Sequence, residues 1–403
     1  MRNANKYTYI RLFNLIKGIF LSFIFIFIPK NKNRIIFSST GNLKYDHNSK
    51  YLFEYFLEKY PIYEIKYVIN DEELKQKLEK EIGNYFISTN NIKGILYSLF
   101  AYTWVVSSLE TPVGGLFLRF NRLVVHLGHG TPLKNIGLLE KKISFLKKIY
   151  YFLIKENFSY VLSTSEEFLK IMANFLGIPL ERVIVQGQPR NDSIFLRKEK
   201  FLEKEFLIRD ESKNILYAPT WRPKKETKIF PFNDFEIESL EKFLRKENIN
   251  IFLRAHPDFE DKIEGKFLKI KGIYILNSKK VVDISEYLSC FDLVITDYSS
   301  IFIDYLLLKK PVAFIPYDLK EYSTEIGFTV DYNLHTPGPK IKTYLEFQEE
   351  VQKLLNNKDY YKNEREKENK FYNCYLDNNN SERVANFIIN KINKINNERR
   401  LYR

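Results

Sequence analysis

Several features that mark common protein classes are rare or missing in this chain of 403 residues. Only two cysteines occur, Cys290 and Cys374, which argues against a disulfide scaffold or a thiolate metal site and fits a reducing compartment. The sequence has no GxxxxGK[ST] loop and no GxGxxG after its first predicted strand, so an ATPase of that class and a nicotinamide dinucleotide are disfavoured. A DxD motif and Cys/His clusters are also missing, so we predict no metal and no cofactor.

The chain also lacks a hydrophobic run long enough to span a bilayer comfortably. The apolar run at residues 18–28 (GIFLSFIFIFI), even counted from Leu12, gives a helix of about 25 Å against a hydrocarbon core of roughly 30 Å. Residues 1–34 carry seven Lys or Arg and no acid, out of a net charge of +13, and no small-residue cleavage site follows the run.

We therefore predict that residues 1–33 form a membrane-associating segment. The basic flanks suit the anionic cytoplasmic leaflet, in which the segment would lie or dip, with a true span and a core helix as the alternatives. On the first interpretation, removing residues 1–30 releases the protein from membranes without destroying its activity in solution, whereas loss of folding would mean that the segment belongs to the core. Outside residues 1–34 the charge excess is only +6 and follows no continuous stripe, which disfavours a basic, membrane-tethered nucleic-acid-binding protein.

From Arg34 onward, short apolar strands alternate with helical patterns, which predicts parallel βαβ units and an α/β fold with two Rossmann-like halves and a cleft between them. The first half spans residues 34–195, and the second spans 214–378. A charge-rich segment at 196–213 is predicted as a solvated connecting helix, and residues 379–403 form a C-terminal helix or tail.

A further amphipathic helix is predicted over residues 139–155. Its apolar stripe is wide, and lysines occupy the opposite side. The pattern fits a second membrane-contact helix and a core helix with a solvated edge equally well.

Two histidines follow apolar strands in parallel settings, His129 in HLGHGTPLKNIG and His256 in FLRAHPD. Carboxyl ends of parallel strands line the ligand-binding edge of such sheets, and an imidazole there can take a proton from a hydroxyl or stabilise a leaving phosphate. A structural role is the ordinary alternative for either one alone. Beside His129, the chain offers backbone flexibility, a hydroxyl and a charge at Gly130, Thr131 and Lys134.

Cations, hydroxyls and carboxylates gather at the other predicted strand ends. Arginine can clamp a phosphate with two hydrogen bonds, and Asn or Asp can accept a polyol or ribose hydroxyl. Ser299 and Ser300 begin a helix directly after the buried strand at 293–296, where capping of that helix is the alternative to phosphate binding. The other candidates at predicted strand ends are Gly187, Arg190, Asn191, Asp192, Thr220, Arg222, Arg254 and Asp304. Together, these side chains suit a substrate that contains a pyrophosphate.

The ordered motifs HGTPLKNIG, GQPRND, YAPTWR, RAHP and TDYSSIFIDYLLLKKPVAF resemble those of the CDP-glycerol glycerophosphotransferase family, which makes teichoic acids and related capsule polymers. The resemblance runs from about Arg34 to Ser381. It implies a GT-B-like fold in which an N-terminal acceptor domain and a C-terminal CDP-donor domain face each other across a cleft. It also implies an enzyme at the cytoplasmic membrane face that moves a polyol phosphate, most simply glycerol phosphate, from a CDP-polyol to a hydroxyl of a lipid-linked or polysaccharide acceptor and releases CMP.

By this resemblance, His129 is the expected base that deprotonates the acceptor hydroxyl, and His256 is expected near the donor pyrophosphate. The donor is expected to contact Arg190, Asp192, Thr220, Ser299 and Ser300, and Asp304 to orient a polyol or sugar hydroxyl. Gly128 and Pro223 stand where the family often carries an aromatic and an acidic residue, which leaves glycerol, ribitol and other polyols open. A GT-B glycosyltransferase that uses a nucleotide sugar is the alternative enzyme.

Overall fold

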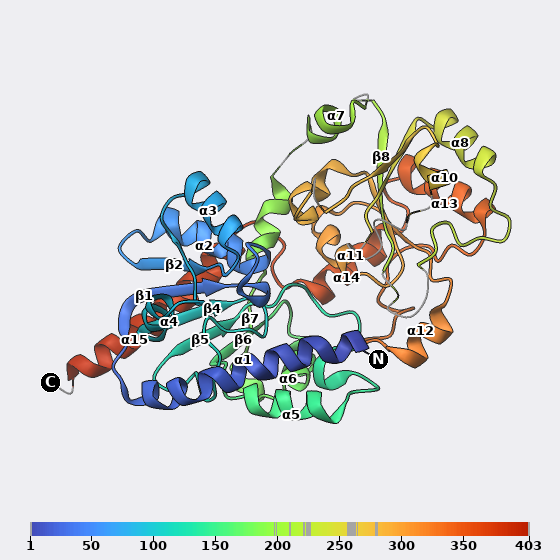
Figure 1. Cartoon of the computed structure of the whole chain (residues 1–403). Coiled ribbons are helices and arrows are strands. Elements are labelled where there is room, and N and C mark those ends of the chain that lie inside the picture. Colours follow the sequence, from blue (N-terminus) through green and yellow to red (C-terminus); the bar gives the residue numbers. More distant parts are fainter. Residues whose placement is uncertain are drawn as a thin grey trace. The chain divides into compact units, whose positions relative to one another are not determined.

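The computed structural model describes residues 2–196, 198, 200–208, 211–220, 222, 227–255, 263, 265–278 and 281–401. It divides into two compact units. Unit 1 contains residues 1–130, 136–192 and 379–403, and unit 2 contains residues 131–135 and 193–378. Each unit is built on a sheet of parallel strands with helices on its faces, which confirms the predicted α/β class (Figure 1).

The sheet of unit 1 has seven strands in the order β3-β2-β1-β4-β5-β6-β7. Its central pairings are parallel, with Ile35 of β1 opposite Ile65 of β2 and Thr103 of β4. Consecutive residues of a strand point to opposite faces, so the unbroken apolar runs read from the sequence belong to strands that are covered on both sides. The strands are β1 (Asn31–Ser38), β2 (Glu64–Val68), β3 (Phe86–Ile87), β4 (Ala101–Val106), β5 (Leu123–His126), β6 (Tyr160–Ser163) and β7 (Val183–Val185).

Two hydrophobic layers cover this sheet. One layer contains Trp104 and Val124 and packs against α1 (Arg2–Phe27), α4 (Ile92–Leu99), α5 (Phe145–Ile154) and α6 (Leu169–Leu176). The other contains Val105 and Val125 and packs against α2 (His47–Lys59), α3 (Glu72–Glu81) and α15 (Asn380–Leu401). Helix α15 therefore completes the core of unit 1, whereas the sequence predicts a C-terminal helix or tail outside the two halves.

Helix α1 is docked on unit 1 by small residues. A Cβ on Gly18 would lie 1.8 Å from the carbonyl oxygen of Gly114, so only glycine permits this approach. The hydroxyl of Ser22 accepts a hydrogen bond from the amide of Leu116 at 3.1 Å, and Leu15 is buried in the core. None of the helices in the described part of the chain is both long and apolar enough to cross a bilayer. The expectation that residues 1–30 can be removed without harm to the fold does not suit this packing, because their loss would uncover one hydrophobic layer.

Two predicted helices are shorter than their sequence patterns suggest. Helix α5 begins at Phe145 rather than near Leu139, because Ser144 caps it by accepting a hydrogen bond from the amide of Lys147. In the segment 196–213, helix α7 spans only Lys200–Phe206. It is not simply solvated, since Leu202 is buried and the Phe206 ring packs against Phe252 in unit 2. The charged composition of this segment therefore concealed the few apolar side chains that pack against unit 2.

Unit 2 has five parallel strands in the order β10-β9-β8-β11-β12. A large apolar cluster on one face joins the sheet to α8 (Ile237–Lys246) and α13 (Tyr344–Asn356). The strands are β8 (Lys213–Ala218), β9 (Ile249–Leu253), β10 (Ile273–Ile275), β11 (Leu293–Thr296) and β12 (Val312–Phe314). Unit 2 also contains α10 (Gly265–Leu268), α11 (Ile301–Tyr305), α12 (Leu319–Glu325) and α14 (Lys362–Tyr372).

A short piece of the HGTPLKN motif belongs to unit 2. Residues 131–135 run beside residues 326–329, and the backbone amide of Thr329 donates to the carbonyl of Leu133 at 3.0 Å. Lys134 forms an antiparallel bridge with Phe328. The motif therefore divides, with His129 in unit 1 and Thr131 and Lys134 in unit 2.

Candidate active site

His129 lies at the carboxyl end of β5 in unit 1. Gly128 and Gly130 on either side of it have positive φ angles of 66° and 145°, a backbone path that other residues rarely adopt. The His129 ring stacks on the His47 ring at a centroid distance of 5.0 Å. The double-glycine turn thus holds the imidazole at the strand end, where the sequence pattern predicts it.

The proton on the His129 ring can be assigned from its hydrogen bond. Nδ1 lies 3.2 Å from the backbone carbonyl oxygen of Ser107, and because a carbonyl only accepts, Nδ1 carries the hydrogen of the neutral ring. The lone pair is then on Nε2. His129 as a residue is exposed to solvent, although protein atoms surround its ring closely enough to desolvate it. This desolvation lowers the pKa of His129 below 6.5, and the positive charge of Arg190 acts in the same direction.

Asn48 connects the loops around this histidine. Its side chain is fully buried at the start of α2, and its amide nitrogen donates to the carbonyl of Gly128 at 3.0 Å. Its oxygen accepts from the backbone amide of Arg190 at 3.1 Å. One side chain therefore fixes the His129 turn against the GQPRND turn, in which the Oδ1 of Asn191 is buried without a hydrogen-bond partner among the described residues.

Asp192 and Gly187 differ from their predicted roles. Both carboxylate oxygens of Asp192 are engaged by the start of α15, accepting from the amides of Asn380 at 2.8 Å and Ser381 at 2.7 Å. A Cβ on Gly187 would lie 1.6 Å from the Oδ1 of Asn380. These residues anchor the C-terminal helix, so the hydrogen bonds that suggested a donor ligand at Asp192 go to the protein instead.

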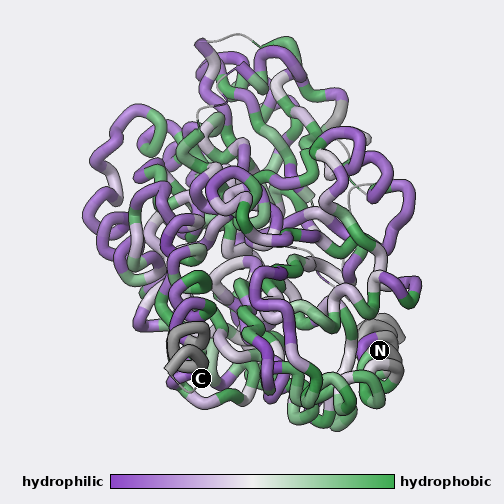
Figure 2. The backbone as a smooth tube through the Cα atoms, turned by 90° about the vertical axis from the view of Figure 1, so that its left-hand side faces the viewer, coloured by the Kyte–Doolittle hydropathy of each residue, from purple (hydrophilic) through white to green (hydrophobic). Residues whose placement is uncertain are grey.

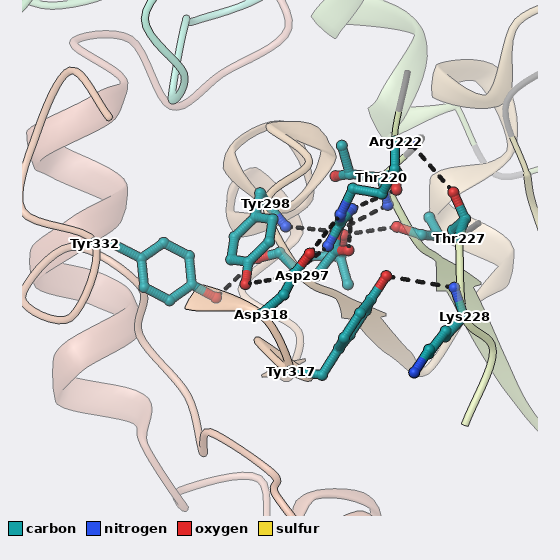
Figure 3. Close-up of polar contacts among 11 residues, drawn as sticks. Thr220, Arg222, Thr227, Lys228, Asp297, Tyr298, Tyr317, Asp318 and Tyr332 are labelled. Carbon is teal, nitrogen blue, oxygen red and sulfur yellow. Dashed lines mark hydrogen bonds and ion pairs between the residues drawn. The ribbon is translucent and has the colours of Figure 1, made fainter. Parts of the chain in front are cut away.

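Unit 2 gathers a dense polar cluster at the carboxyl ends of β8, β11 and β12 (Figure 3). The Arg222 guanidinium binds Asp318 through Nε at 2.9 Å and Nη2 at 2.8 Å, and its Nη1 lies 2.9 Å from Asp297. The rings of Tyr298, Tyr317 and Tyr322 surround it at 4.9 to 5.0 Å.

Arg222 therefore differs from the predicted phosphate clamp, because two carboxylates occupy its buried guanidinium. Desolvation lowers the pKa of Arg222, but Asp318 and Asp297 outweigh it, and the net shift is upward. Burial raises the pKa of Asp318, and the bonds from Arg222 reverse this, so that its pKa lies below the ordinary value. The cluster is a charged support beneath the strand ends.

Thr220 contributes a hydroxyl that the cluster itself does not use. Its backbone amide donates to Asp297 at 2.8 Å, while its buried hydroxyl has no hydrogen-bond partner among the described residues. An unsatisfied buried hydroxyl costs free energy unless a ligand or water completes it. Lys134 is half-buried nearby, where burial lowers its pKa, Asp297 opposes this and Arg222 adds to it.

The helix after β11 is short. Ser299 and Ser300 are half-buried before α11, and the Ser299 hydroxyl accepts a long hydrogen bond of 3.4 Å from the amide of Ile301. No side-chain capping bond comes from Ser300 in the described structure. Both hydroxyls therefore lie at the strand end without a strong capping role, as phosphate ligands would, whereas Asp304 is buried within α11.

Arg254 and His256 complete the set of predicted site residues. Arg254 follows β9, and its Nη1 donates to the carbonyl of Leu276 at 2.9 Å. His256 lies outside the described residues and stays a prediction. The described residues contain no group of three or more His, Cys, Asp or Glu side chains arranged to hold a metal ion.

The sequence analysis missed several residues around His129. Asp46, His47 and Asn48 follow β1 in the sequence DHN and begin α2, and Ser107 follows β4. The signal was present for Ser107, because a polar residue directly after a buried strand marks the ligand edge of a parallel sheet. Asp46, His47 and Asn48 come eight or more residues after β1 ends at Ser38, so this signal did not mark them. Asp297 and Asp318 were also overlooked as partners of Arg222, since their pairing crosses 75 and 96 residues of chain.

Comparison with known proteins matches residues 20–390 to the model of the family described as CDP-Glycerol:Poly(glycerophosphate) glycerophosphotransferase. The chain is 28% identical over 334 residues to a teichoic acid glycerol-phosphate transferase from Staphylococcus aureus, covering 77% of this chain and 81% of that protein. It is 27% identical over 356 residues to a teichoic acid poly(ribitol-phosphate) polymerase from Bacillus spizizenii, covering 85% of this chain. It spans only about half the length of that polymerase (54%).

A solved structure of the wall teichoic acid polymerase TagF superposes with a TM-score of 0.75 at 22% identity, covering 96% of this chain and 98% of that one. The two proteins therefore share a fold. The family match covers most of the chain and includes both units. We conclude that this chain belongs to the CDP-glycerol:poly(glycerophosphate) glycerophosphotransferase family.

Proposed function

We propose that this protein transfers a polyol phosphate, most simply glycerol phosphate, from a CDP-polyol to a hydroxyl of a teichoic-acid-type or capsule acceptor and releases CMP. The observation that carries the proposal is the geometry of His129, a neutral imidazole held through Nδ1 by the Ser107 carbonyl with Nε2 available as a base. Its place in a chain of this family supports the assignment.

In the proposed reaction, the acceptor hydroxyl attacks the phosphorus that carries the polyol. Its proton goes to Nε2 of His129, the new P–O bond forms, and the bond to the bridging oxygen breaks, so that CMP leaves with the electron pair. The lowered pKa of His129 keeps its ring neutral and able to accept this proton near pH 7. Arg190 beside it offers positive charge to the reacting phosphate.

The donor is proposed to bind at the strand ends of unit 2. The free hydroxyl of Thr220 and the two serines after β11 offer hydrogen bonds to phosphate oxygens, and Lys134 offers charge. Arg222 and its two carboxylate partners stabilise the loops at these strand ends. Arg254 and His256 are proposed on the donor side from the motif alone, as is Asp304 for a polyol hydroxyl.

We also propose that unit 1 binds the cytoplasmic surface of the membrane through α1. Its outward residues Ile16, Phe20 and Phe27 are 63%, 75% and 85% exposed, and Phe145 and Phe152 of α5 are exposed as well. Figure 2 shows predominantly hydrophobic residues along the helical stretch next to the N terminus. An apolar stripe of this kind beside lysines suits an anionic lipid surface, with α1 lying in the interface.

The proposal is tested by incubating the purified chain with CDP-glycerol, CDP-ribitol and a nucleotide sugar, each with an acceptor of lipid-linked poly(glycerol phosphate). Phosphoryl transfer predicts CMP in step with polyol incorporation. Release of a nucleoside diphosphate from the nucleotide sugar, with no CMP from either CDP-polyol, would show a glycosyltransferase instead and contradict the proposal.

A further inference from the structure

A cavity of about 310 Å³ lies in unit 1 between α1 and the carboxyl ends of β1, β2 and β3. Its volume falls at the lower end of the range of small-molecule sites. The sheet side is lined by neutral hydrogen-bonding groups, among them Asn42, Asn70 and Thr89. On the helix side, Leu15 and Leu21 of α1 are apolar, and Arg11 of the same helix is charged.

The charges around this cavity are already paired. Arg11 of α1 is the only cation and Glu110 the only carboxylate among its described lining residues, and the Nε of Arg11 donates to Glu110 at 2.6 Å. A pyrophosphate or nucleotide needs unpaired cations, so this lining does not suit one. Neutral amides, hydroxyls and backbone groups suit the hydroxyls of a polyol or sugar.

Asn42 points independently to a ligand. The residue is only 9% exposed, and its Nδ2 donates to the carbonyl of Thr111 at 2.9 Å. Asn42 lines the cavity, and its buried Oδ1 has no hydrogen-bond partner in the described part of the chain. A buried acceptor of this kind costs free energy until a donor reaches it, and a ligand hydroxyl is such a donor.

One segment of chain connects the His129 turn to the cavity wall. The carbonyl of Ser107 holds the His129 ring, and residues 109–115, which follow it, form a wall of the cavity. The Glu110 carboxylate is close enough to His129 to act on its pKa. On the other side, α1 closes the cavity and presents the exposed apolar stripe that we assign to the membrane.

We propose that this cavity binds the uncharged, hydroxyl-bearing head of a membrane-carried acceptor, a polyol or sugar unit, while α1 keeps the attached lipid in the bilayer. The identification of the bound group as an acceptor rests on the proposed function. The binding of ligand hydroxyls by the neutral amides of the lining depends only on the cavity and not on the reaction.

The test fills the cavity from two walls with Leu109→Trp and Ile95→Trp, and uses Leu43→Trp as the matched control. Leu43 is 50% exposed and lies outside the lining. In transfer from CDP-glycerol to lipid-linked poly(glycerol phosphate) in vesicles, either folded filling variant should raise the acceptor KM at least about tenfold, and by more than the donor KM. The control should leave both values unchanged. Acceptor KM values within about twofold of wild type in both filling variants would overturn the proposal.

A binding measurement separates this inference from the proposed reaction. Octyl glucoside, below its micelle concentration, should give saturable binding to the wild-type chain and to Leu43→Trp, and binding should be lost in the filling variants. Octylphosphocholine has the same chain length without the sugar and should bind weakly or not at all. Equal binding of both probes would mean that the site recognises the alkyl chain, and absent binding of octyl glucoside would mean that it does not recognise hydroxyls. Either result overturns the proposal even if CMP release is observed.

Discussion

The Nδ1 of His129 lies 3.2 Å from the backbone carbonyl oxygen of Ser107, and this one contact fixes which ring nitrogen can act as a base. Ser107 directly follows β4 and His129 follows β5, two neighbouring strands of the unit 1 sheet. The parallel sheet brings the two strand ends together, so the tautomer of the histidine is a consequence of the fold.

Arg190→Gln should shift the pH dependence of transfer. The Arg190 charge lowers the pKa of His129, so its removal raises that pKa, and a smaller fraction of the ring is neutral at any acidic pH. The acid limb of kcat/KM should therefore move to higher pH, in addition to any fall in rate. Arg182→Gln is the control, because Arg182 pairs with Glu156, and its acid limb should stay in place. An unmoved limb in Arg190→Gln would show that His129 is not the titrating base.

Thr220→Val should weaken donor binding without unfolding unit 2. The change keeps the shape of the side chain and removes one hydroxyl, which predicts a rise of about five- to tenfold in the KM for CDP-glycerol. Thr103→Val is matched to it, because the Thr103 hydroxyl is also buried without a partner in the described residues but lies within β4. If both variants behave alike, Thr220 has no part in donor binding.

Asp192→Ala should act on stability and spare the KM for the donor. The carboxylate satisfies the first amides of α15, and losing such a cap costs about 1–2 kcal/mol in the free energy of unfolding. Urea denaturation measures the loss, and faster hydrogen exchange at the start of α15 locates it. Glu181→Ala, at an exposed acid, should change neither. A large increase in the donor KM with unchanged stability would restore the ligand role that the sequence suggests.

The pair Phe20→Glu and Phe27→Glu should reduce binding to anionic vesicles at least about tenfold, because two exposed apolar side chains become charged. Both side chains point away from the core, so the unfolding midpoint should stay at the wild-type value. Ile62→Glu is the control, at a residue that is 81% exposed in the turn after α2. Vesicle flotation measures the binding, and unchanged flotation of the double variant would remove α1 from the membrane contact.

The sequence predicted the strands well because both sheets are parallel and buried on both faces, which produces apolar runs such as 293–296 that match β11. It could not predict where the polar residues between strands point. Asp192 looks like a ligand in GQPRND, and only the packing of a helix 188 residues later engages its carboxylate. Arg222 is similar, since its guanidinium meets Asp318, 96 residues away.

Asn48 is a residue whose role the sequence did not reveal, whereas Asp192 and Arg222 were given ligand roles too readily. Nothing local in the sequence marks it as the link between the His129 turn and the GQPRND turn, because its partner Arg190 is 142 residues distant. The sequence also treated residues 1–33 as an attachment, since composition reports hydrophobicity but not the close approach of Gly18 to Gly114 that docks α1. Long-range packing thus determines which candidate side chains already have partners within the protein.

The central claim is that His129 takes the proton of the acceptor hydroxyl, and CMP release by His129→Asn at pH 7 tests it most directly. Loss of a general base predicts at least about a hundredfold fall in transfer, with the unfolding midpoint and the affinity for CDP-glycerol close to wild type. Transfer at a rate near that of the wild-type protein in a folded His129→Asn variant would contradict the account.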